Sequence, residues 1–172
     1  MIRRIFTYPD KVLKKKSKPV TAFNASLHGL LDDMYETMVD RNGVGLAAIQ
    51  VGEALRALII LLPDEEGNYE KSELLEVINP VIIEKDGSVR SNEGCLSVPE
   101  YYDEVDRFEN IKVEYQDRDG NKKTIRSGGF IAIALQHEMD HLEGHLFVEK
   151  LSLMKRKKFE KEYKKLQKNK RL

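Results

Sequence analysis

The chain has a single cysteine, Cys95, and no hydrophobic run long enough to cross a membrane. One cysteine cannot form an intramolecular disulfide, so a disulfide-stapled scaffold is excluded. A membrane-spanning helix needs about 20 apolar residues, and the most strongly apolar run, Ala57–Leu62, is far shorter. Residues 1–9 lack the apolar core and small-residue cleavage site of a signal peptide. These absences predict a cytoplasmic location, where the cysteine stays available as a thiolate.

The composition is that of an ordinary globular domain. The 172 residues are 41% hydrophobic, and their formal charges sum to zero. A chain of this length can bury a substantial core without splitting into separate units. We therefore expect a single domain over residues 1–172.

Apolar residues at helical spacing predict an amphipathic helix early in the chain. Asn24 or Ser26 is a suitable N-cap, and Asn42-Gly43 is a suitable end. The apolar residues of its predicted buried face are Leu27, Leu30, Leu31, Met34 and Met38.

Strand-like segments occupy the middle of the chain. Residues 55–62 and 74–83 are rich in Leu, Ile and Val and are separated by an acidic turn. Residues 111–116 and 122–126 alternate polar and apolar side chains around Asp119-Gly120, which predicts a β-hairpin. Strands grouped between helices, without a βαβ rhythm, indicate an α+β fold.

Two histidines lie four residues apart in the segment 136–144, Gln-His-Glu-Met-Asp-His-Leu-Glu-Gly. The apolar residues before it favour a helix, and Gly144 is suited to end one. On a helix His137 and His141 share a face and can reach one metal ion. Glu138 then lies beside the metal without being a ligand, which suits a general base. Most histidine pairs are ordinary core or surface residues, but imidazoles among carboxylates on a half-buried helix are costly without a cation.

A catalytic metal site of this kind needs a third protein ligand, and the residues alone leave three candidates. A metzincin-like pattern would need a histidine where the chain has Phe147, and His145 comes too early. A thermolysin-like site takes a glutamate from a later helix, for which Glu160 or Glu162 is available. The remaining candidate is Cys95.

Three short motifs occur in order along the chain. They are Gly43-Val44-Gly45-Leu46-Ala47-Ala48-Ile49-Gln50, Glu93-Gly94-Cys95-Leu96-Ser97 and His137-Glu138-x-x-His141. Each is moderately specific by itself, and the three together are highly specific. Their order and separations resemble those of the peptide deformylase family, and the resemblance extends from Ile5 to about Lys158.

This resemblance implies a hydrolase that removes the formyl group from formylmethionyl nascent peptides and releases formate. It implies Cys95, His137 and His141 as ligands of one divalent metal ion, with Glu138 as general base. The family implies Fe²⁺, whereas thiolate and imidazole ligands also suit Zn²⁺, and Ni²⁺ or Co²⁺ can occupy such a site in purified protein. The implied fold has antiparallel strands packed around the motif helix.

The resemblance also implies which groups surround the substrate. The Leu96 N–H and the Gln50 amide would stabilise the oxyanion, and the Gly45 backbone would bind the peptide. The methionine side chain would enter an apolar pocket lined by Val44, Phe130, Ile133, Ala134 and the His137 ring. Of these, Phe130, Ile133 and Ala134 are equally compatible with an ordinary core.

Two further expectations concern the segment around Cys95. By family analogy, Glu93 and Arg107 form an ion pair that fixes this segment. Many family members carry an arginine where this chain has Tyr102. Tyrosine lacks the charge and the donor fork of arginine, so the preference for substrate residues after the first is left open.

The end of the chain is strongly basic. From 155 to 172, lysine and arginine greatly outnumber the two acids, Glu160 and Glu162. A helix is expected over about 152–168, followed by a frayed tail at 169–172. An apolar stripe of Phe159, Tyr163 and Leu166 would dock it. The basic helix is either ordinary solvated surface or an attachment to the RNA-rich ribosome. No motif for sequence-specific nucleic-acid binding is present.

Two other classes of function remain open. The first is a zincin-type endopeptidase that uses Glu160 or Glu162 as third ligand. The second is a metal-stabilised binding module without catalysis. Glu138 argues against the binding module, because a structural metal site has no need of an unliganded carboxylate beside the ion.

Overall fold

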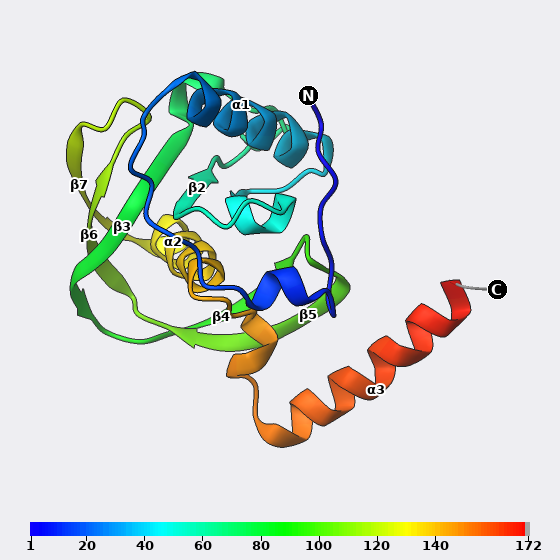
Figure 1. Ribbon diagram of the computed structural model, residues 1–172. Coiled ribbons are helices and arrows are strands. Elements are labelled where there is room, and N and C mark those ends of the chain that lie inside the picture. Colours follow the sequence, from blue (N-terminus) through cyan, green and yellow to red (C-terminus); the bar gives the residue numbers. More distant parts are fainter. Residues whose placement is uncertain (171–172) are drawn as a thin grey trace.

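The helix that carries the two histidines, α2 (Gly129–Leu142), runs through the middle of the fold with strands around it (Figure 1). The structure is a computed structural model that describes residues 1–170. The helix ends as predicted, with Gly144 in the left-handed region at φ 81°. At that position a Cβ atom would lie against the Lys14 backbone, so glycine is needed there for space as well as conformation.

Among residues 1–170, seven strands form two antiparallel sheets. The larger sheet has the order β1-β2-β3-β6-β7, and β4 pairs with β5 in the smaller one. The large sheet contains β1 (Gly45–Ala47), β2 (Ala57–Ile60), β3 (Leu75–Asp86), β6 (Asn110–Gln116) and β7 (Lys122–Gly128). The small sheet contains β4 (Val89–Cys95) and β5 (Val98–Arg107). The predicted α+β class and the predicted hairpin, now β6 and β7, are confirmed.

The first long helix, α1 (Ala25–Asp40), forms where the apolar spacing predicts it. Its N-cap is Asn24, whose side-chain oxygen accepts a hydrogen bond from the Leu27 N–H at 3.1 Å. All five predicted apolar residues are buried in a cluster with β1 and β2 residues. A second cluster packs the large sheet against α2, so the motif helix is held on its apolar side by the sheet.

Two parts of the backbone differ from the sequence-based expectation. The segment 43–50, for which no strand was predicted, contains strand β1 and a 3₁₀ turn over Ala48–Val51. Strand β5 was not predicted at all. Its outward and inward positions both carry charged residues, so no apolar alternation marks it, and it forms because β4 pairs with it. Other short 3₁₀ turns lie at Lys11–Lys14, Lys71–Glu73 and Phe147–Lys150.

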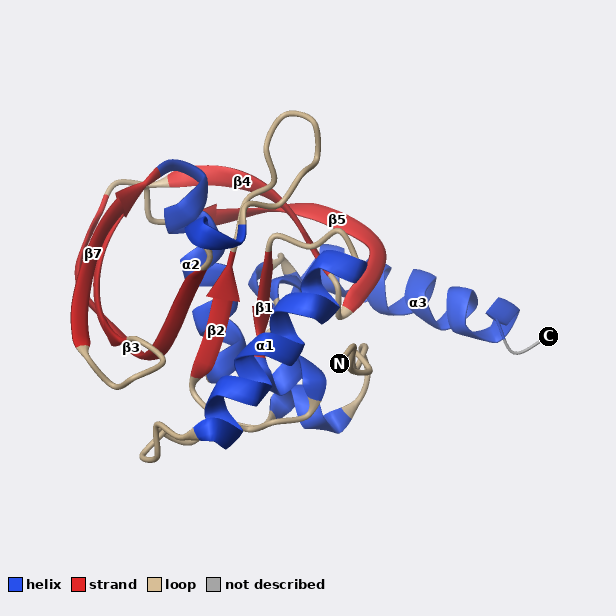
Figure 2. Cartoon of the chain, turned by 90° about the horizontal axis from the view of Figure 1, so that it is seen from above, coloured by secondary structure: helices blue, strands red, loops and turns tan. Residues whose placement is uncertain are grey.

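The last helix, α3 (Leu153–Lys170), projects away from the rest of the molecule (Figures 1 and 2). Phe159 and Tyr163 dock it as predicted, whereas Leu166 is 38% exposed and lies outside the docked stripe. The helix continues to Lys170, past the predicted start of the frayed tail; residues 171–172 of that tail lie outside the described residues. Within residues 1–170, no helix is long and apolar enough to span a membrane.

Candidate active site

Cys95, His137 and His141 converge although they come from two separate elements. Cys95 is the last residue of β4, and both histidines lie on α2. One potential ligand atom from each lies within 4.8 Å of the other two. The Cys95 Sγ atom is 3.4 Å from Nε2 of His141. Tetrahedral coordination with metal–sulfur and metal–nitrogen bonds of ordinary length separates such atoms by about 3.5 Å. The three residues therefore fit one divalent metal ion.

The other proposed third ligands lie elsewhere. Glu160 and Glu162 are exposed residues of α3, and His145 is exposed and contacts Glu149. In the part of the chain described, residues 1–170, the group of Cys95 and the two histidines is the only potential metal-ligand cluster found.

A carboxylate orients the first histidine. Oε1 of Glu93 lies 2.8 Å from Nδ1 of His137, so Nε2 of that ring remains for a metal. Burial tends to lower the pKa of His137, but contacts with Cys95 and Glu93 outweigh it and raise this pKa well above its ordinary value. Burial and the neighbouring charges of His137 and Arg107 lower the pKa of His141. The Nδ1 atom of His141 is buried without a hydrogen-bond partner among the described residues.

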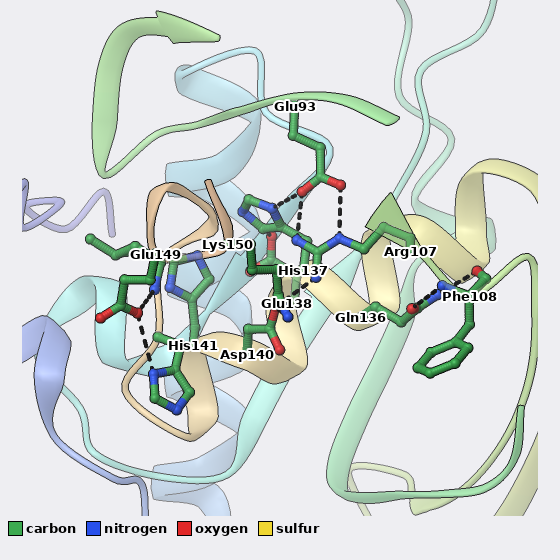
Figure 3. Close-up of polar contacts among 12 residues, drawn as sticks. Glu93, Arg107, Phe108, Gln136, His137, Glu138, Asp140, His141, Glu149 and Lys150 are labelled. Carbon is green, nitrogen blue, oxygen red and sulfur yellow. Dashed lines mark hydrogen bonds and ion pairs between the residues drawn. The ribbon is translucent and has the colours of Figure 1, made fainter. Parts of the chain in front are cut away.

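Arg107 makes two contacts with the Glu93 carboxylate, and Oε1 of Glu93 contacts both Arg107 and His137 (Figure 3). The two contacts are Nε to Oε2 at 2.8 Å and Nη2 to Oε1 at 2.6 Å. Burial alone would raise the pKa of Glu93, but hydrogen bonds from Arg107 and His137 lower it to about 2. Glu93 is therefore an anion held between two donors, and the expected ion pair is present as a contact.

Glu138 is the acidic group nearest the proposed ligands that has no strong partner of its own. It is 5% exposed, and its Oε2 atom has no hydrogen-bond partner among the described residues. Its other oxygen is 4.0 Å from Nε2 of His137. Burial raises the pKa of Glu138 to about 7 in the metal-free protein, against the opposing effect of His137. A free carboxyl in this position can accept or release a proton.

Cys95, His137 and Glu138 line a cleft of about 550 Å³, a size typical of small-ligand sites, whereas His141 lies fully buried behind it. All the predicted pocket residues line it. From the first motif and the cysteine segment come Val44, Gly45, Gln50 and Leu96; from α2 come Phe130, Ile133, Ala134, His137 and Glu138. Tyr102 also lines the cleft and is 69% exposed at its rim.

The Gln50 side chain is buried and held at both ends. Its Oε1 atom accepts a hydrogen bond from the Ala47 N–H at 2.9 Å. Its Nε2 atom donates to Ser97 Oγ at 3.0 Å and makes a longer contact of 3.5 Å with Cys95 Sγ. Ser97 is in turn anchored by the Phe6 carbonyl at 2.7 Å. In the sequence Ser97 is only one residue of the cysteine motif, and no local pattern indicates its role in fixing Gln50.

Two more residues of α2, Gln136 and Asp140, were given no role from the sequence. Gln136 bonds the backbone of Phe108, and Asp140 bonds Arg107. A usable signal existed, because polar residues four apart on the motif helix share a face. Their partners, about 30 residues earlier in the chain, could not be read from local spacing.

Comparison with known proteins agrees with this geometry. The family model described as "Polypeptide deformylase" matches residues 2–157. A peptide deformylase of Wolinella succinogenes is 58% identical over 163 residues, which cover 95% of this chain and 96% of the relative.

Solved structures agree as well. The crystal structure of a peptide deformylase from Legionella pneumophila has a TM-score of 0.88 and 44% identity, covering 97% of this chain and 98% of that one. The Met-Ala-Ser-bound class I type b peptide deformylase from Acinetobacter baumannii has a TM-score of 0.81 and 35% identity, covering 88% and 99%. Sequence, fold and clustered side chains thus lead to one conclusion: this chain belongs to the polypeptide deformylase family.

Proposed function

We propose that Cys95, His137 and His141 hold a divalent metal ion at the site where this chain removes the formyl group from N-terminal formylmethionine. The observation that carries the proposal is the convergence of a thiol and two imidazoles beside Glu138, a buried carboxyl whose Oε2 atom has no hydrogen-bond partner within residues 1–170. When bound, the ion supplies Lewis acidity that makes water a stronger nucleophile and polarises a carbonyl. The endopeptidase reading is not favoured, because its proposed ligands, Glu160 and Glu162, are exposed on α3.

The chain's own residues then move the protons and hold the charge. Glu138 takes a proton from the attacking water and later gives it to the leaving amine. The Leu96 N–H and the Gln50 amide stabilise the negative charge that develops on the formyl oxygen. One hydrogen of the Gln50 amide is donated to Ser97 Oγ, and the other makes a long contact of 3.5 Å with Cys95 Sγ that the formyl oxygen would replace. The products are formate and a free N-terminal methionine.

The cleft supplies the recognition of substrate. The methionine side chain occupies the apolar pocket of Val44, Phe130, Ile133 and Ala134, and the Gly45 backbone binds the peptide. The Met-Ala-Ser bound to the Acinetobacter baumannii relative supports a tripeptide of this kind as a ligand. Tyr102 at the rim would contact later residues by its ring rather than by a charge.

The finer assignments rest on the family. We propose Fe²⁺ as the native ion, with Zn²⁺, Ni²⁺ or Co²⁺ able to replace it in purified protein. We further propose that residues 1–172 act as one catalytic domain in the cytoplasm on N-formylmethionyl nascent peptides. The basic side chains of α3 would attach the chain to the ribosome by releasing counterions from RNA phosphates.

The direct test is formate release from formyl-Met-Ala-Ser by protein purified anaerobically and loaded with Fe²⁺. The same peptide carrying an acetyl group is the control for substrate selectivity. The proposal expects rapid formate release that stops on chelation and returns when the ion is restored. Cleavage between methionine and alanine without formate release would replace the deformylase assignment with an endopeptidase.

A further inference from the structure

We propose that Gln136 and Asp140 are positioning residues for the metal site. They hold the end of β5 on α2, so that Arg107 can keep Glu93 against His137. This inference rests on the proposed function, since it takes His137 as a metal ligand. Both residues point from α2 toward the Arg107–Phe108 segment (Figure 3).

Gln136 satisfies the backbone where the chain leaves β5. Phe108 lies between β5 and β6, where neither strand ladder includes it. The Phe108 N–H donates to Oε1 of Gln136 at 2.9 Å, and the Gln136 Nε2 atom donates to the Phe108 carbonyl, also at 2.9 Å. The same Nε2 atom donates to the Ala132 carbonyl of α2 at 3.0 Å. The buried Gln136 amide thus binds both the N–H and the carbonyl of Phe108, and so fixes the residue after β5 to helix α2.

Asp140 fixes the side chain of Arg107, the residue before Phe108 in the chain. Its Oδ2 atom accepts a hydrogen bond from Nη1 of Arg107 at 2.6 Å. The Arg107 side chain is only 2% exposed, whereas that of Asp140 is 25% exposed and also lies 3.6 Å from the Lys150 ammonium. The Arg107 guanidinium therefore lies between two carboxylates, that of Glu93, which is buried, and that of Asp140, which is partly exposed to solvent. Without Asp140, the guanidinium keeps Glu93 but loses the group that fixes its third nitrogen.

The contacts of Asp140, Arg107, Glu93 and His137 form a closed loop that begins and ends on α2. Asp140 binds Arg107, Arg107 binds Glu93, and Glu93 binds His137, which lies one turn before Asp140 on α2. Gln136 and Asp140 are four residues apart and act on adjacent residues of the same segment. Carboxylates behind histidine ligands set ring orientation and metal affinity. Loss of the Asp140–Arg107 contact, or of the Gln136 contacts that fix the neighbouring Phe108 backbone, should loosen the Glu93–His137 contact while leaving all three metal-ligating side chains in place.

The experiment compares Asp140→Asn and Gln136→Met with Glu143→Gln in the full chain. Glu143 is the matched control because it also forms an ion pair from the end of this helix, with Arg56 at 2.8 Å, but its ion pairs among the described residues are with Arg56 and Lys16 and not with Arg107. Affinity for Co²⁺ is measured by competition with a chelator, and ligand geometry by the absorption spectrum of the Co²⁺-loaded protein. Stability in urea is measured on the metal-free proteins.

We expect Asp140→Asn and Gln136→Met each to weaken Co²⁺ binding about tenfold and to alter the cobalt spectrum, while Glu143→Gln leaves both unchanged. The inference is overturned if both variants bind Co²⁺ within twofold of wild type and differ only in their urea midpoints, as the control does. If Gln136→Met does not fold, Asp140→Asn decides the question alone. Absence of formate release from wild type would overturn the proposed function, yet the Co²⁺ comparison would still test the positioning.

Discussion

A Cβ atom on Gly45 would lie 2.8 Å from Oε1 of Glu138. Strand β1 therefore passes so close to the proposed general base that any side chain at position 45 would have to displace Glu138. The first and third sequence motifs are thus in direct contact, and the glycine of one determines the position of the carboxyl of the other.

Gly45→Ala should displace Glu138 while the ligands stay in place. The three nearest atoms to the added methyl group all belong to the Glu138 side chain, which can move. A shift near 1 Å in a catalytic group can cost about 100-fold in rate, so we expect kcat for formate release to fall by about that factor with metal content unchanged. Gly29→Ala on α1 is the control, because a Cβ there meets nothing within 4 Å. Equal kcat values for the two variants would contradict the account.

Glu138→Gln tests the proton transfer itself. The amide keeps the size of the side chain but cannot act as a base, and general base catalysis contributes about 10²–10⁴-fold. We expect kcat to fall within that range while the metal content stays at one ion per chain. Because Oε2 of Glu138 has no partner among the described residues, the melting temperature of the metal-free variant should be no lower than that of wild type. Rates near wild type would remove Glu138 from the mechanism.

Arg107→Met should destabilise the protein as well as weaken metal binding. Glu93 is 6% exposed, and the substitution would leave its carboxylate buried with His137 as its remaining side-chain partner. Breaking a buried ion pair in this way costs about 3–5 kcal/mol, which urea unfolding of the metal-free protein would measure.

The double variant Glu93→Gln/Arg107→Met provides the control. Removing both charges should recover part of the lost stability without restoring metal affinity, because the carboxylate behind His137 is gone. If Arg107→Met alone were as stable as wild type, the buried Glu93 carboxylate would not need Arg107 as its ion-pair partner.

Phe159→Ala should release α3 from the rest of the fold. The Phe159 ring is 2% exposed and lies 4.6 Å from the Tyr101 ring and 5.1 Å from the Tyr8 ring, measured between centroids. Since α3 projects from the molecule, losing this anchor should open the helix locally rather than unfold the domain. Limited proteolysis should cut within 153–170 faster than in wild type, whereas Leu166→Ala should be cut at the wild-type rate. Equal cleavage of all three proteins would refute the anchor.

The sequence predicts those parts of the fold that local patterns determine. Helix α1 follows from apolar spacing and its Asn24 cap, and the hairpin of β6 and β7 follows from alternation around a turn. Strand β5 escaped prediction because its inward face includes Asp103 and Arg107 instead of an apolar row. Strand β1 is three residues long and begins with a glycine, so only its pairing with β2 makes it a strand.

The candidate site likewise combines residues that a local pattern indicates with residues that only distant contacts bring together. His137, Glu138 and His141 lie within one helical turn or little more, so their spacing alone indicates a metal site. Spacing could not choose Cys95 over Glu160 or Glu162, and only the family resemblance did. The roles of Gln136, Asp140 and Ser97 depend on contacts with residues distant in the chain, which no local pattern contains.

If Cys95 completes the metal site of a deformylase, Cys95→Ala should remove both the bound metal ion and the activity. Bound metal per chain and formate release from formyl-Met-Ala-Ser would be measured on the same anaerobic preparations of wild type and variant. We expect about one ion per wild-type chain, with both the ion and the activity lost in Cys95→Ala while circular dichroism shows that the fold persists. A variant that keeps its metal ion would contradict the account and return the third ligand to another residue.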